Sequence, residues 1–105
     1  MVGNMLYTSG QIAINPKSGE LVLDNITNET KLVMENLKAV LAEANMTFEN
    51  VFKTTIFISD MHNFSAINEV YGTYFNSDTA PARETVEVAN LPKFVNVEIS
   101  VIAVK

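Results

Sequence analysis

Hydrophobic and polar positions alternate over short distances in several parts of the chain, a pattern typical of β-strands. In the final segment, Asn96 to Val104, every second position from Val97 onward is aliphatic. The segment Val51 to Ile58 is rich in β-branched and aromatic residues, which predicts a buried strand. Further strands are predicted at Met5 to Ile14, at Glu20 to Leu23 and at Glu84 to Ala89. The first of these is expected to be interrupted at Ser9-Gly10, where glycine indicates a bulge or a close backbone approach.

Two longer segments carry hydrophobic residues at three-and-four spacing, which predicts amphipathic helices. The first runs from a cap at Asp24 or Thr27 to about Ala44. Asn45 is expected to end this helix in a left-handed conformation. The second helix is expected over Asp60 to Phe75. Turns or loops are expected at residues 15–19, 76–82 and 90–93.

Strands and helices alternate without internal repeats, so residues 1–105 are expected to form one α+β domain. The last predicted strand is apolar on both faces apart from Glu98 and Ser100. We expect one of its faces to pack on the helices and the other to meet a second copy of the chain.

Charge and composition exclude several classes of protein. Twelve acidic residues stand against seven scattered basic ones, for a net charge of -5, whereas nucleic-acid binders gather basic residues on one face. There is no cysteine, so disulfides, thiolate metal sites and a cysteine nucleophile are excluded. No segment approaches the ~20 apolar residues of a membrane span, and the first residues do not show the basic segment and apolar run expected of a signal peptide. We therefore expect a cytoplasmic protein without nucleic-acid or membrane partners.

The single histidine, His62, lies in the predicted first turn of the second helix. No acidic cluster stands at ligand spacing from it, so we expect no metal site and a surface position for His62.

Two residues are candidates for chemistry. Arg83, the one arginine, follows Pro81-Ala82 in a segment that we expect to be a loop, and its planar fork of donors can bind a carboxylate through two hydrogen bonds. The alternative is a solvated arginine or an internal ion pair. Glu98 places a charge inside an apolar strand, where a carboxylate is costly unless it is paired or used. Its alternative is an ion pair with a lysine across an interface.

The segment Pro81 to Lys93, followed by Val97-Glu98-Ile99 and Ile102-Ala103-Val104, resembles the signature of the RidA/YjgF family, which also carries the label endoribonuclease L-PSP. Further matches lie, in family order, at Thr8 to Ile12, Asn36 to Leu41, Val51 to Phe57 and Asn68 to Tyr71. The resemblance covers nearly the whole chain. It implies a mixed β-sheet backed by two α-helices, of the chorismate-mutase-like YjgF type, and a barrel-like homotrimer with a ligand cleft at each subunit boundary.

The resemblance also implies roles for particular residues. Arg83 matches the arginine that binds the carboxylate of a small 2-imino acid, and Glu98 matches the glutamate that positions or activates the attacking water. The substrate-binding positions that the resemblance implies are Ser9, Gly10, Asn68, Tyr71 and Thr85. Four of them have a structural alternative: a sheet bulge for Ser9-Gly10, a loop contact for Asn68, and core packing for Tyr71.

Three departures from the family pattern stand out. Asn90 replaces a common arginine, and Ser100 replaces a second acidic residue. The family's first strand, with its Gly-Pro-Tyr, does not precede the hairpin dipeptide Gly3-Asn4. We therefore expect that the strand lies upstream in the gene and that the chain without it deaminates weakly.

The expected function is cofactor-free hydrolysis of enamine or imine intermediates, such as 2-aminoacrylate and 2-iminopropanoate, to 2-keto acids and ammonia. One alternative is a regulator that binds 2-keto acids or amino acids at the same intersubunit cleft. An endoribonuclease or translation inhibitor is the third alternative, and an acidic chain with one histidine disfavours it.

Overall fold

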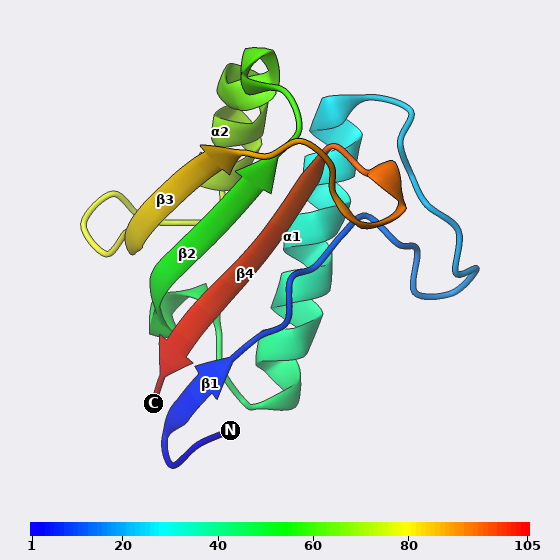
Figure 1. Cartoon of the computed structure of the whole chain (residues 1–105). Coiled ribbons are helices and arrows are strands. Elements are labelled where there is room, and N and C mark those ends of the chain that lie inside the picture. Colours follow the sequence, from blue (N-terminus) through cyan, green and yellow to red (C-terminus); the bar gives the residue numbers. More distant parts are fainter.

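A mixed four-stranded sheet is covered on one face by two α-helices in the computed structural model, which describes residues 1–105 (Figure 1). The sheet order is β1-β4-β2-β3; β2 and β3 run parallel, and the other two pairs are antiparallel. The elements are β1 (Met5–Tyr7), α1 (Ile26–Glu43), β2 (Val51–Ile58), α2 (Phe64–Gly72), β3 (Ala82–Glu87) and β4 (Val97–Val104). This arrangement confirms the predicted α+β class and the sheet backed by two helices.

The core lies between the sheet and the helices. On β4, the residues that face α1 are buried and alternate with half-buried ones, as the hydrophobic pattern predicted. The predicted apolar stripe of α1 supplies Val33, Leu37 and Leu41, which are fully buried. Burying side chains of this size stabilises by about 1.5–3 kcal/mol each, so this layer holds the helix on the sheet. Neither helix is long and apolar enough to cross a membrane.

The ends of α1 confirm one prediction and correct another. Asn45 has a φ of 57°, the left-handed conformation expected of the helix terminator. The N-cap, however, is Asn25, whose side chain accepts a hydrogen bond from the backbone N–H of Asn28 at 2.8 Å. The prediction of Asp24 or Thr27 was therefore wrong. Asp24, Asn25 and Thr27 are all residue types that can cap a helix. Asn25 takes the N-cap position because its backbone is extended directly before the first helical residue.

Other boundaries also differ from the predictions. The segment predicted as one helix from Asp60 splits into a 3-10 turn, Met61–Asn63, and α2, which ends at Gly72. The predicted strand at Glu20 to Leu23 is reduced to one bridge between Ile14 and Leu21. The strand predicted from Glu84 begins at Ala82, so Arg83 lies in a strand and not in a loop. Hydrogen-bonded pairing with β2 adds Ala82 and Arg83 to the beginning of β3. This pairing is a contact between distant segments, so the local sequence does not reveal it.

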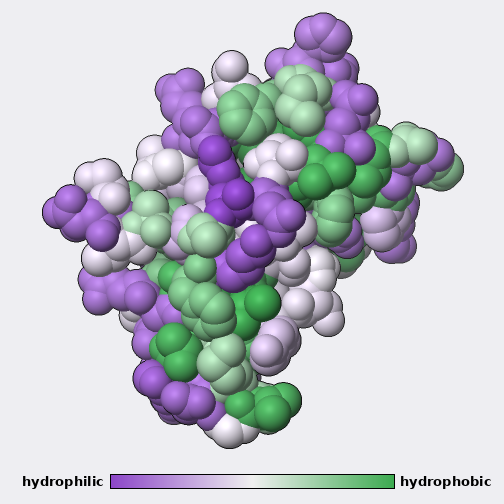
Figure 2. Space-filling model, turned by 60° about the vertical axis from the view of Figure 1, so that its left-hand side comes forward, coloured by the Kyte–Doolittle hydropathy of each residue, from purple (hydrophilic) through white to green (hydrophobic).

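The opposite face of the sheet carries no covering layer (Figure 1). By pairing register this face includes Tyr7, which is 60% exposed, Val86, which is 44% exposed, and half-buried Ile102. Figure 2, in which the β3 side is brought forward, shows hydrophobic patches between hydrophilic ones. These exposed apolar side chains suit an interface, because their contact with water is unfavourable.

Candidate functional site

Arg83 lies at the start of β3 and reaches over α2. Its Nη1 donates a hydrogen bond to Oδ1 of Asn68. The guanidinium carbon lies 5.2 Å from the ring centroid of Tyr71 and 5.7 Å from that of Phe64, within the range of cation–π attraction. One side of the guanidinium is therefore fixed by α2.

No acidic side chain pairs with Arg83, because the ion pairs of the chain are Lys53–Glu84 and His62–Asp60. The alternative that Arg83 forms an ion pair inside one chain is therefore excluded. A planar fork with free N–H groups remains, and it can receive both oxygens of a carboxylate.

Tyr71 serves the core and the site together. Its side chain is nearly buried, at 6% exposure, and its hydroxyl donates to Oγ1 of the fully buried Thr54 at 3.0 Å. Burial raises the pKa of Tyr71, while the hydrogen bond to Thr54 and the charge of Arg83 act to lower it. The tyrosine is therefore a neutral platform beneath the guanidinium. Thr54 is a supporting residue that the sequence reasoning missed, although a threonine at an inward strand position was a usable signal.

An open groove of about 530 Å³ adjoins the guanidinium. Side chains of α2 and of the segment before β3 form its walls, including Asn68, Phe75 and Pro81. A groove of this size admits a small organic acid with a few bound waters.

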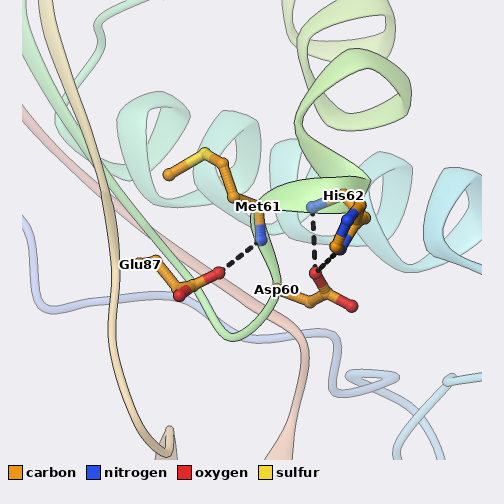
Figure 3. A network of polar contacts seen from close by, with 4 residues as sticks. All are labelled: Asp60, Met61, His62 and Glu87. Atoms are coloured by element: carbon orange, nitrogen blue, oxygen red, sulfur yellow. Dashed lines mark hydrogen bonds and ion pairs between the residues drawn. The ribbon is translucent and has the colours of Figure 1, made fainter.

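A polar network fixes the 3-10 turn that precedes α2 against the end of β3 (Figure 3). Oε1 of Glu87 accepts from the backbone N–H of Met61 at 2.6 Å, and Oδ1 of Asp60 accepts from the backbone N–H of His62 at 2.9 Å. The backbone and side-chain hydrogen bonds from His62 lower the pKa of Asp60. The side chain of His62 is 96% exposed, which confirms its predicted surface position. The network links the two elements that carry Asn68 and Arg83.

Glu98 and Gly10 form a second group. A Cβ atom added to Gly10 would lie 2.6 Å from Cδ of Glu98, so the glycine backbone touches this side chain. The close approach predicted from glycine is thereby confirmed. Ser9, which precedes Gly10, is exposed.

The two groups lie on opposite faces of the sheet. Arg83 is paired in parallel register with Thr54, whose side chain is buried beneath α2, and Thr85 is paired with the buried Ile56. Glu98 is paired with Phe57, the neighbour of Ile56, so its side chain points to the uncovered face. One chain therefore brings Asn68, Tyr71 and Arg83 together, and separately Gly10 and Glu98, but does not unite the two groups.

Thr85 shares the helix-covered face with Arg83. Its hydroxyl oxygen is buried and has no hydrogen-bond partner in the chain. Buried polar atoms normally have a partner, so Thr85 is the predicted site residue whose side chain is left unsatisfied. No group of three His, Cys, Asp or Glu side chains is placed to hold a metal ion.

Comparisons with known proteins identify the family of the chain. The sequence profile of the family described as Endoribonuclease L-PSP matches residues 1–105. The chain is 42% identical over 106 residues to the 2-iminobutanoate/2-iminopropanoate deaminase of Escherichia coli, and the match covers 99% of this chain and 82% of the relative.

Solved structures give the same result. A protein of the conserved Rid family from Yersinia pestis superimposes with a TM-score of 0.96 at 47% identity, covering 100% of this chain and 83% of its own. The Escherichia coli protein TdcF, solved with bound serine, superimposes with a TM-score of 0.92 at 39% identity, covering 100% of this chain and 84% of its own. The fold, the profile match and these identities show that the chain belongs to the endoribonuclease L-PSP family, also known as RidA/YjgF.

Proposed function

We propose that this protein is a cofactor-free deaminase of small 2-imino acids. The observation that carries the proposal is the guanidinium of Arg83, which α2 fixes on one side and no acidic residue neutralises. The 42% identity to a 2-iminobutanoate/2-iminopropanoate deaminase supports the same substrate class. A carboxylate in the adjoining groove would meet the free N–H groups of this fork.

The reaction needs a water molecule and a base. Water adds to the imine carbon while the nitrogen is protonated, and the resulting carbinolamine loses ammonia to leave the 2-keto acid. In this proposal Glu98 accepts the proton of the attacking water, and backbone groups near Ser9 and Thr85 orient the substrate. A fixed cation also offsets the repulsion that a chain of net charge -5 exerts on an anionic substrate.

The opposite placement of Arg83 and Glu98 supports a shared site between subunits. In a closed ring of three chains, the uncovered face of one subunit would bring Glu98 to the Arg83 group of the next. Light scattering after gel filtration tests this arrangement, with three times the chain mass as the expected result. A monomer at micromolar concentration would leave the two groups apart and contradict the shared site.

The activity is tested with 2-aminoacrylate generated in place by a dehydratase acting on serine. Lactate dehydrogenase and NADH report the release of the keto acid. We expect the protein to accelerate release above the spontaneous rate, and Arg83→Ala to abolish the acceleration. If Arg83→Ala turns over normally, the assignment of the site is wrong.

A regulator that binds a small acid without turnover is the second candidate, which the bound serine in the relative TdcF favours. Calorimetric titration with serine separates the two. Saturable binding together with an unaccelerated keto-acid release supports the regulator, whereas acceleration supports the deaminase.

A further inference from the structure

We propose that Glu29 and Asn36 of α1 are positioning residues that hold Glu98 against Gly10. The inference rests on the proposed function in assigning a role in turnover to Glu98. Both residues lie on the sheet side of α1, about two helical turns apart, and neither touches the Arg83 group.

Glu29 holds the beginning of β4. It is fully buried, and its Oε2 accepts hydrogen bonds from the backbone N–H of Asn96 at 2.8 Å and of Val97 at 3.2 Å. Its Oε1 accepts from Nδ2 of Asn96 at 2.8 Å. Val97 directly precedes Glu98, so this carboxylate fixes the backbone from which the Glu98 side chain departs. Three N–H groups thus hold this buried carboxylate, and no cation pairs with it. Removing the carboxylate would leave those donors unpaired, which is costly in a buried position.

Asn36 holds the other side of the contact. Its Nδ2 donates to the carbonyl oxygen of Ile12 at 3.2 Å and to that of Ile14 at 2.9 Å. The segment between β1 and α1 contains only isolated bridges, so few ladder hydrogen bonds restrain it. The side chain of Asn36 therefore supplies the hydrogen bonds that a neighbouring strand would otherwise give to the segment that carries Gly10.

The two contacts meet at one backbone pair. Gln11 and Ile99 exchange hydrogen bonds, with N···O distances of 2.8 Å and 3.1 Å, and they directly follow Gly10 and Glu98. Apart from the hydrogen bonds between Thr8 and Val101, this bridge is the connection nearest to Gly10 and Glu98, so loss of either α1 contact would loosen the separation of these two residues. A displacement of about 1 Å at a catalytic group lowers turnover by on the order of a hundredfold.

The variants separate positioning from general stability. Asn36→Asp keeps the size of the side chain but removes both donor hydrogens. Asn96→Asp sets a second carboxylate against Glu29, and adding Glu29→Gln supplies an amide that can donate to it, so the double variant should restore the contact. Val33→Ala is the control, because it removes core volume from the same stretch of α1 without altering a polar contact.

The measurements are kcat and KM for keto-acid release, taken where circular dichroism shows each variant folded, and amide exchange rates of Gln11 and Ile99. We expect Asn36→Asp and Asn96→Asp to lower kcat at least tenfold with KM within twofold, and to speed exchange at both amides at least tenfold. Glu29→Gln/Asn96→Asp should return kcat and exchange to within about threefold of the wild type. Val33→Ala should lower the unfolding temperature and leave kcat within twofold.

Unchanged exchange and kcat in Asn36→Asp and Asn96→Asp would overturn the inference, as would an equal fall of kcat in Val33→Ala. If the wild type does not accelerate keto-acid release, the proposed function fails by itself. The exchange rates then still decide whether Glu29 and Asn36 hold the contact between the two segments.

Discussion

Replacing Gly10 with alanine tests the placement of Glu98 directly. The added Cβ would lie 2.6 Å from both Cδ and Oε1 of Glu98, whereas carbon atoms in contact are about 3.5–4.0 Å apart. One of the two must therefore move by about 1 Å. Gly10 has no positive φ, so alanine fits its backbone, and the Glu98 side chain is the part that can rotate away.

The expected loss is large in turnover and small in stability. A shift of about 1 Å at a catalytic carboxylate lowers kcat by on the order of a hundredfold, or about 2.7 kcal/mol in activation free energy. Replacing glycine by alanine at a compatible position stabilises by about 0.4–1 kcal/mol through the unfolded chain, which offsets part of the crowding. We expect the free energy of unfolding to stay within about 1 kcal/mol of the wild type.

The assay is keto-acid release from 2-aminoacrylate, together with urea unfolding of each variant. The control is the pair Glu98→Gln and Gly10→Ala/Glu98→Gln. If Gly10→Ala acts by displacing the carboxylate, the double variant should be hardly slower than Glu98→Gln alone. A Gly10→Ala protein with wild-type turnover, or a double variant in which both losses multiply, would refute the reasoning.

Three further outcomes are expected. Arg83→Lys keeps the charge but loses the fork, so kcat/KM should fall by about 10- to 100-fold while the unfolding temperature is unchanged; equal kcat/KM would refute the carboxylate contact. Glu98→Gln should lower kcat far more than keto-acid affinity measured by calorimetry, and a collapse in thermal stability would instead indicate a structural ion pair. Burial, followed by the hydrogen bond to Glu35 and its negative charge, raises the pKa of Tyr74 from 10.0 to about 12. Because the folded-state pKa is the higher one, stability is fully present below pH 10.0 and is lost as pH rises toward 12; in pH-dependent urea unfolding, Tyr74→Phe should flatten this fall.

Local pattern in the sequence determined most of the elements. The predicted strand Val51 to Ile58 coincides with β2, and the final strand differs from β4 by one residue at its start. Short-range alternation and three-and-four spacing reflect the burial of one face of an element, and this information is contained in neighbouring residues. The resemblance to RidA/YjgF also identified the family from ordered motifs along the chain.

Tertiary structure decided which candidate residues can act together. The sequence pattern placed Arg83 in a loop, and only the pairing of β3 with β2 puts it on the same strand face as Thr85 and relates that face to the face of Glu98 on β4. That relation depends on the pairing of β3 and β4 with β2, and a shift of one residue in either register would reverse it. The cation–π contact of Arg83 with Tyr71 and the hydrogen bonds of Asn96 to Glu29 likewise join residues far apart in sequence. Such contacts form only when the packed core brings the elements together, so no local pattern can reveal them.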